Sequence, residues 1–249
     1  MVDGMFSRLA RLSDSAANAA VKNSLRWLVD YYFRVETAGL ENIPDSGPAI
    51  LVANHSGAWG LDGFILHASL SRDFHRCFYI QASGLVLKFP ILGPCAHSVN
   101  VRADPTLGYS ELVAGQLVAM FPEGFAGLRK PFRQRYQLRP FGPGFAATAI
   151  CTGAPIVPVS IIGAEEALPK VAELSSLARL LNLPYFPVTT AFPLPSKWLI
   201  SAGKPIAAPP KGETALERSS AAQRLSGEVQ LALQEMLELE RLKRNTPFW

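Results

Sequence analysis

The chain has 249 residues, of which 49% are hydrophobic and 18% are charged, and it carries a formal net charge of +4. This charged fraction lies below the usual ~25%, which is compatible with a surface that faces a membrane, and the length allows one large α/β domain or two small ones. The mild positive charge suits anionic lipid or phosphate ligands. We expect no nucleic-acid partner, because the basic residues form no helix or sheet motif that would present them to one.

The cysteines and the start of the chain bear on the compartment. Cys77, Cys95 and Cys151 are an odd number in apolar surroundings and define no disulfide framework, so a reducing compartment fits best. Cys95 and His97 alone are too few ligands for a metal site, and we expect no metal. No apolar block follows the first residues, so the sequence indicates no secretory signal.

The predicted elements begin with one or two amphipathic helices between Met5 and about Phe33. Basic residues decorate the rest of this segment. Two interpretations stay open: the segment packs on the main domain, or it lies on an anionic bilayer with its basic residues toward the headgroups. The apolar residues that recur at helical spacing are Phe6, Leu9, Leu12, Ala16 and Ala20, followed by Leu25, Leu28 and Tyr32.

Strand-like and helix-like stretches alternate from residue 49 onward. Short apolar strands separated by helices predict an α/β fold with a mostly parallel mixed sheet covered by helices on both faces. The uncharged stretch 140–164 is broken by proline and glycine, so we expect no transmembrane helix there. Strands are expected at 49–54, 77–83, 97–102, 117–122, 155–164 and 198–206, and helices at 61–70, 104–116 (with Asp104 as its N-cap) and 144–153.

The last third of the chain holds two distinctive segments. Residues 183–198 are rich in proline and aromatic residues and carry no charge before Lys197, so they either cap a core or dip into lipid. A charged amphipathic helix is expected from Glu213 onward. We therefore divide the chain into N-terminal membrane-associating helices (1–34), one α/β domain (35–210) and a C-terminal helix (211–249).

The stretch "NHSGAWGLD", Asn54–Asp62, follows the predicted strand "AILVA". The ends of buried strands are where α/β proteins place functional side chains. A neutral imidazole at His55 can accept a proton at physiological pH, and a carboxylate on its other nitrogen fixes the tautomer and stabilises the imidazolium. From these residues alone, a catalytic pair of His55 and Asp62 and a pair that merely closes a loop both remain open.

Three further stretches narrow the choice. "SVNVR" ends on Arg102, "AMFPEG" contains Glu123 and Gly124, and "GAPIVPVSIIGAEE" contains Pro158. Together with the histidine block, and in their order and spacing, they resemble the glycerolipid acyltransferase family, which includes the lysophosphatidic acid and glycerophosphate acyltransferases. The resemblance covers roughly residues 44–166 and implies the α/β fold of that family.

The resemblance also implies a role for the pair at the first block. His55 would be the general base that takes the proton from an acceptor hydroxyl, and Asp62 would be its partner. General-base catalysis of this kind contributes typically 10²–10⁴-fold. Backbone N–H groups of the turn 56–60 are candidates for binding the oxyanion.

The other matching residues receive binding roles from the resemblance. Arg102, Glu123 and Gly124 would hold the polar, usually phosphate-bearing, end of the acceptor, and Pro158 would shape the acyl-donor side. The guanidinium of Arg102 suits phosphate, whereas Glu123 would repel it and would instead accept from a glycerol hydroxyl or orient Arg102. The structural alternatives are an ion pair for Arg102 and Glu123, a tight turn for Gly124 and strand packing for Pro158.

The chain departs from the family pattern at two places. Six residues separate His55 from Asp62, where the family commonly has four, and Phe125-Ala126 follows "FPEG", where the family often has Thr-Arg. The basic run 129–139 is either a headgroup-binding patch in place of that arginine or a solvated loop. A neutral lipid alcohol therefore remains an alternative acceptor.

The resemblance implies an O-acyltransferase that moves a fatty acyl group from acyl-CoA or acyl carrier protein to a lysophospholipid-like acceptor of the 1-acylglycerol-3-phosphate type. We expect no cofactor, no covalent acyl-enzyme, membrane lipids as partners, and a peripheral position at the cytoplasmic face of a membrane. The alternatives are acylation of diacylglycerol or a long-chain alcohol, and a degenerate lipid-binding protein. A serine hydrolase built around Ser56 is disfavoured because the chain has no G-x-S-x-G elbow.

Overall fold

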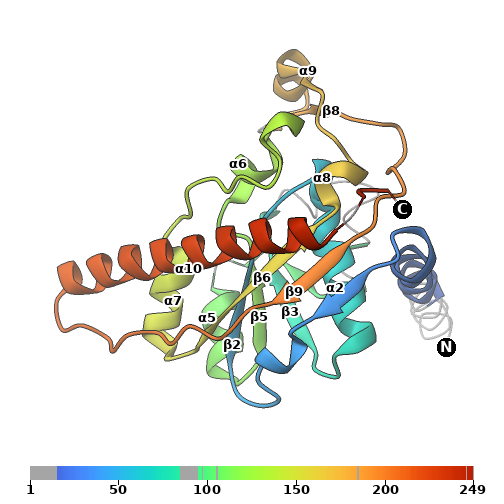
Figure 1. Cartoon of the computed structure of the whole chain (residues 1–249). Coiled ribbons are helices and arrows are strands. Elements are labelled where there is room, and N and C mark those ends of the chain that lie inside the picture. The colour runs from blue at the N-terminus through green and yellow to red at the C-terminus, as the bar shows by residue number, and fades with distance from the viewer. Residues whose placement is uncertain are drawn as a thin grey trace, which may run out of the picture.

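The computed structural model describes residues 16–84, 95–96, 98–104, 106–183, 185–244 and 246–248. At its centre lies a seven-stranded sheet in the order β1-β9-β6-β2-β5-β3-β4 (Figure 1). Its strands are β1 (Glu36–Ala38), β2 (Ala49–Ala53), β3 (Phe78–Gln81), β4 (Val101–Arg102), β5 (Leu117–Met120), β6 (Ile156–Ile162) and β9 (Leu199–Ala202).

The sheet is mixed but mostly parallel. Strands β6, β2, β5, β3 and β4 pair in parallel, whereas β9 runs antiparallel to β6 and β1 runs parallel to β9. The carboxyl ends of the five parallel strands therefore meet at one edge, which is where open α/β sheets bind ligands. The predicted α/β fold class is confirmed.

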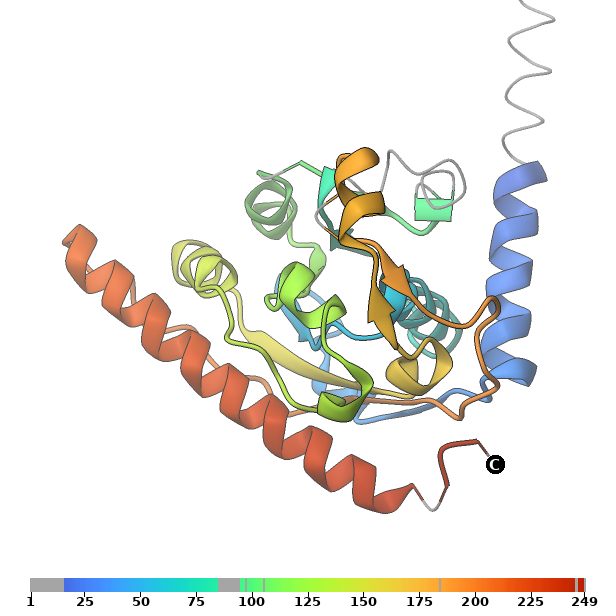
Figure 2. The ribbon, with the colours of Figure 1, turned by 90° about the horizontal axis from the view of Figure 1, so that it is seen from above.

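Helices cover both faces of the sheet (Figure 2). One face packs against α2 (Leu61–Asp73), the helical residues 16–27 and the π-helix η1 (Leu28–Tyr32). The other face packs against α5 (Leu107–Val113), α7 (Gly144–Thr152) and α10 (Ala215–Lys243). Because both faces are covered, every residue of β2, β5 and β6 is buried, which explains why all of these residues except Ser160 are apolar.

Local sequence signals set several helix ends. A capping box starts α10, in which Thr214 and Glu217 each bind the other's backbone N–H. Gly153 ends α7 at a φ of 69°, a left-handed conformation that favours glycine, as the sequence predicts. Docking of α10 buries one stripe of its side chains against α7 and the sheet, namely Leu225, Val229, Leu233 and Leu237.

Two sequence predictions around β4 were wrong in detail. Of the predicted strand 97–102, only Val101–Arg102 is a strand, because Asn100 takes a left-handed φ of 54° and turns the chain; His97 lies outside the described residues. The helix expected at 104–116 is shortened to α5, and its N-cap is Thr106 rather than Asp104. The Asp104 carboxylate instead accepts the Thr106 N–H at 2.8 Å.

The described part of the N-terminal segment packs on the domain. Leu25, Val29 and Phe33 are buried in the core, while Trp27 and Tyr31 are 54% and 71% exposed. The repeat of Phe6, Leu9 and Leu12 lies outside the described residues. No helix within the described ranges combines the length and the apolar character that crossing a bilayer requires.

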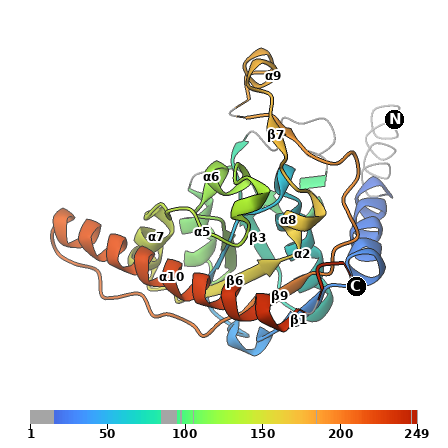
Figure 3. The same ribbon diagram turned by 45° about the horizontal axis from the view of Figure 1, so that its top comes forward.

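An excursion of the chain between β6 and β9 rises above the carboxyl edge of the sheet (Figure 3). It starts at α8 (Ala164–Ala167) and contains the antiparallel pair β7 (Ala172–Glu173) and β8 (Pro187–Val188), joined through α9 (Ser175–Leu180). Its return segment ends on Trp198, which is fully buried with its ring 5.1 Å from that of Phe33. The end of the aromatic segment 183–198 therefore caps the core.

Candidate active site

His55 follows β2 at the carboxyl edge of the sheet, and its neighbour Asn54 anchors the loop. The Asn54 amide donates to the Ile161 carbonyl at 2.9 Å and accepts the Ile161 N–H at 2.7 Å. These two bonds join the end of β2 to β6, so the backbone that carries His55 starts from a fixed point.

The loop after His55 then turns sharply back on itself. Gly57, Trp59 and Gly60 all have left-handed φ values, between 69° and 76°, and the 3-10 turn η3 (Ala58–Gly60) leads directly into α2. A Cβ on Gly57 would lie 2.6 Å from the Ala164 carbonyl oxygen, so only glycine fits there. This geometry accommodates the six residues between His55 and Asp62.

Asp62 lies in the first turn of α2 and meets the imidazole. Its Oδ2 is 2.8 Å from His55 Nδ1, and its side chain is fully buried while that of His55 is 18% exposed. The carboxylate also accepts the Ser56 N–H at 2.7 Å and the Gly63 N–H at 2.9 Å. Because an ionised carboxylate only accepts, Nδ1 is the donor in this contact, and Nε2 is left as the proton acceptor.

A cavity of about 550 Å³ opens beside His55. None of its lining side chains in the described part of the chain is charged. Burial raises the pKa of the Tyr185 phenol in this wall above its ordinary value, so the phenol stays neutral. The apolar lining residues include Phe64, Ile80, Met120, Phe121, Phe145 and Leu183.

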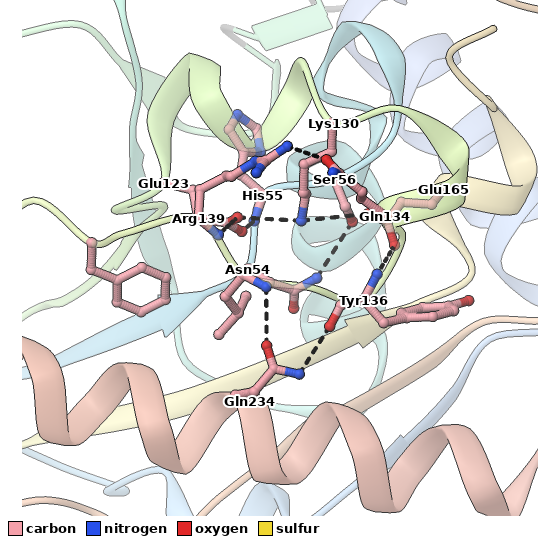
Figure 4. A network of polar contacts seen from close by, with 12 residues as sticks. Asn54, His55, Ser56, Glu123, Lys130, Gln134, Tyr136, Arg139, Glu165 and Gln234 are labelled. Atoms are coloured by element: carbon pink, nitrogen blue, oxygen red, sulfur yellow. Dashed lines mark hydrogen bonds and ion pairs between the residues drawn. The ribbon is translucent and has the colours of Figure 1, made fainter.

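Glu123 supports His55 from the side of the backbone (Figure 4). Its Oε1 accepts the His55 N–H at 2.9 Å, and its Oε2 accepts the Arg139 N–H at 2.7 Å. The buried Lys130 ammonium lies 3.2 Å from Oε2. Glu123 is itself buried and is not among the described residues that line the cavity, so its place in the structure is that of a support for His55.

A buried charge network continues from Glu123 (Figure 4). Lys130 Nζ also lies 3.4 Å from Glu165 Oε1, and Glu165 Oε2 accepts the Tyr136 N–H at 2.8 Å. Burial raises the pKa of the Glu165 carboxyl to about 7, although Lys130 and the Tyr136 N–H act in the opposite direction. Next to it, Glu166 pairs with Arg244 at 2.7 Å.

The remaining predicted site residues lie in different places. Gly124 lines the cavity at the start of α6 (Gly124–Leu128). Arg102 follows the lining residue Val101, but its own guanidinium lies over the Tyr79 ring, 5.7 Å from the centroid, and contacts neither Glu123 nor the cavity in the described structure. Pro158 is buried in the middle of β6, paired with β2 and away from the cavity lining.

Two of the amides considered for an oxyanion are already used. The Ser56 N–H binds Asp62, and the Ala58 N–H donates to the Leu168 carbonyl at 3.2 Å. Ser56 itself is buried, with 1% of its surface exposed. The turn therefore serves first to hold the carboxylate of Asp62.

Sequence reasoning missed two residues that shape the site. Lys130 belongs to the basic run 129–139, for which the sequence predicts a headgroup-binding patch or a solvated loop, yet it is buried between Glu123 and Glu165. At Gly127, a Cβ would lie 2.4 Å from the His55 carbonyl oxygen, so α6 approaches His55 as closely as glycine allows. No local signal in the sequence reveals these contacts, because Gly127 meets His55 across 72 residues and Lys130 meets Glu165 across 35 residues.

A known protein family matches the part of the chain that carries the candidate site. The acyltransferase family model matches residues 34–162, about half of the chain and the part that carries His55, Asp62, Arg102, Glu123 and Pro158. The chain belongs to the acyltransferase family.

Relatives are found in bacteria and plants. Uncharacterized proteins of Mycobacterium tuberculosis and Mycobacterium bovis are each 39% identical over 233 residues, which is 88% of this chain. The chain spans only 65% of the length of these relatives. A chloroplastic 1-acyl-sn-glycerol-3-phosphate acyltransferase of Brassica napus is 29% identical over 57% of this chain and 41% of its own.

A solved structure shares the fold. The crystal structure of the 1-acyl-sn-glycerophosphate acyltransferase PlsC from Thermotoga maritima matches with a TM-score of 0.59, over 94% of this chain and 81% of that chain. At 21% sequence identity, this match shows a common fold.

Gly127→Ala tests the close approach of α6 to His55. The added methyl group would collide with a backbone oxygen that cannot move freely, so we expect a loss of about 1–3 kcal/mol in the free energy of unfolding. Urea denaturation measures this loss. Gly227→Ala, in the interior of α10 with open space around its Cβ, is the control and should stabilise the protein by about 0.5–1 kcal/mol. Equal effects of the two substitutions would contradict the predicted crowding.

Glu165→Gln tests the buried carboxyl. Between its ordinary pKa near 4.5 and its folded pKa of about 7, the folded protein holds a proton that the unfolded chain has lost. The contribution of Glu165 to stability therefore falls as the pH rises through this range. Since glutamine does not titrate, we expect the unfolding free energy of the variant, relative to the original protein, to rise by a few kcal/mol from pH 5 to pH 8. If the unfolding free energies of the two proteins, measured by urea denaturation, differed by the same amount at pH 5 and pH 8, the raised pKa would be contradicted.

Proposed function

We propose that this protein transfers a fatty acyl group from a thioester, acyl-CoA or acyl carrier protein, to the hydroxyl of a lipid acceptor. The observation that carries this proposal is the pairing of His55 Nδ1 with the buried Asp62 at 2.8 Å, at the wall of an apolar cavity. Membership of the acyltransferase family supports the reaction class. The apolar walls suit an acyl chain, which gains about 0.8 kcal/mol per buried methylene.

The reaction follows from the orientation of the imidazole. His55 Nε2 takes the proton of the acceptor hydroxyl as its oxygen attacks the thioester carbonyl, while Asp62 stabilises the imidazolium. The carbon–sulfur bond then breaks, the leaving thiolate takes the proton from the imidazolium, and an ester and a free thiol result. No side chain of the protein is acylated in this scheme.

A lysophospholipid-like acceptor of the 1-acylglycerol-3-phosphate type is the first candidate. The Brassica napus relative carries that activity in its name, and Arg102 is the candidate for binding the phosphate. The uncharged lining of the described cavity favours a second candidate, a neutral lipid alcohol such as diacylglycerol. In either case the acceptor is a membrane lipid, so we place the protein peripherally at the cytoplasmic face of a membrane.

The burial of Ser56 argues against a serine hydrolase. Ser56 is 1% exposed, and its hydroxyl accepts a hydrogen bond from the Asn54 amide and is not part of the described cavity lining. A nucleophilic serine needs its oxygen within reach of both the substrate and the histidine.

His55→Ala is the first test of the proposed reaction. Detergent-solubilised protein would be assayed against acyl-CoA and acyl carrier protein donors, each with phosphorylated and neutral acceptors. We expect the variant to lose at least ~10²-fold in turnover with every pair that the original protein uses, because the base is removed. Its thermal unfolding should stay close to that of the original protein. Near-normal turnover would remove His55 from the mechanism.

Arg102→Gln separates the two acceptor classes. If the guanidinium binds a phosphate, the KM for 1-acylglycerol-3-phosphate should rise at least ~10-fold, while kcat and the KM for the acyl donor stay unchanged, because a charged hydrogen bond is lost. Arg224→Gln, at an exposed position of α10, is the control. An unchanged KM for the phosphorylated acceptor, together with faster turnover of diacylglycerol, would favour the neutral acceptor.

A further inference from the structure

The excursion above the carboxyl edge of the sheet exposes large apolar side chains. Val171, Leu174, Leu180 and Leu181 are 71%, 47%, 80% and 49% exposed, and we call them the apolar tip. They flank or belong to α9, which lies far from the sheet (Figures 1 and 3). Grouping of exposed leucines on one projecting segment is unusual for a surface that meets only water.

Basic side chains surround the base of this excursion. The segment 129–139 lies against it, because Phe132 N–H donates to the Lys170 carbonyl and Arg129 pairs with Glu173 at 2.7 Å. Apart from the buried Lys130, the segments 129–139 and 168–183 contain six basic residues and one acid, Glu173. The charge below the apolar tip therefore complements an anionic surface.

The same excursion continues into the wall of the cavity. Leu183 and Tyr185 line the cavity beside His55, and the Tyr185 ring lies 6.0 Å from that of Phe125. Phe186 packs on Trp59 in the loop after His55, with ring centroids 5.2 Å apart. The cavity wall therefore begins at Leu183, two residues after Leu181, the last residue of the apolar tip.

We propose that the apolar tip inserts into the outer part of a lipid leaflet, with Arg133, Arg135 and Arg179 binding anionic headgroups around it. All three arginines are exposed. This arrangement presents the cavity to lipids of the same leaflet, so an acceptor enters sideways with its acyl chain still in apolar surroundings. The inference rests on the proposed function for what enters the cavity, whereas the docking itself does not depend on catalysis.

The exposed leucines of α10 serve as a comparison. Leu231 and Leu239 are 67% and 61% exposed. Glu228 and Glu235 lie one helical turn from Leu231, and Glu235, Glu238 and Glu240 lie near Leu239. Acidic neighbours repel an anionic leaflet, so these leucines provide a matched set of apolar side chains that should not insert.

The test is the binding of the full chain to sedimented vesicles, made of phosphatidylcholine alone or with added phosphatidylglycerol. We expect the double variant Leu180→Glu, Leu181→Glu to bind the anionic vesicles at least ~10-fold more weakly, because buried apolar area is lost. Arg133→Gln should weaken binding to the anionic vesicles roughly fivefold and leave binding to phosphatidylcholine unchanged. The control, Leu231→Glu with Leu239→Glu, should bind within about twofold of the original protein.

Three further measurements distinguish a failure of membrane docking from a failure of the proposed acyl transfer. His55→Ala should bind vesicles as the original protein does, so docking is tested even if no acyl transfer is found. The Leu180, Leu181 variant should keep its turnover of dispersed short-chain substrates and lose turnover of acceptors embedded in vesicles. Amide hydrogen exchange on the vesicles should slow in residues 171–183. The proposal would be overturned if the Leu180, Leu181 variant bound vesicles as well as the original protein, or if exchange slowed only in residues 16–33. It would also be overturned if the double substitution broke up a dimer of this chain and left vesicle binding unchanged.

Discussion

The site depends on His55 being held from two directions. Asp62 binds the ring through Nδ1, and Glu123 binds the backbone N–H of the same residue, so neither the imidazole nor its attachment can rotate freely. The two carboxylates come from opposite sides: Asp62 from the start of α2, and Glu123 from the end of β5. An imidazole fixed in this way has its free nitrogen set in advance of substrate binding, which lowers the entropy cost of reaction.

Holding His55 by carboxylates has an electrostatic consequence. Glu123, Glu165 and Glu166 gather behind the site, and burying them costs free energy unless cations compensate. Lys130 and Arg244 supply that compensation from segments that end up beside the site only after folding. The resemblance assigns Glu123 to the acceptor, yet its contacts are with the protein itself. A substitution at Glu123 would therefore disturb His55 and the charge network together.

The parts predicted from sequence are those with a local or repeating signal. Strand β2 is apolar throughout and β6 is apolar except at Ser160, α10 has both a capping box and an amphipathic pattern, and His55 follows a buried strand. β1 escaped prediction because its three residues, Glu36–Ala38, are partly exposed and carry no alternation. Gly127 meets His55, and Lys130 meets Glu165 as well as the nearby Glu123, so both contacts depend on segments brought together by folding. Arg102 matches the family pattern in type, but the turn at Asn100 decides where its side chain points.

The position of β9 between β6 and β1 governs the order in which the protein can assemble during synthesis. β2, β5 and β6 are complete once residue 162 has left the ribosome, whereas β1 pairs with β9 and has to wait for that strand, which ends at Ala202. Until then Phe33 lacks the Trp198 ring that packs on its side chain and the Trp198 N–H that binds its carbonyl. Pairing of two strands that lie so far apart in the sequence, here β1 and β9, is slow. A newly made chain therefore leaves the apolar side chains of Val29 and Phe33, which are fully buried in the finished fold, without their complete surroundings until β9 has been added.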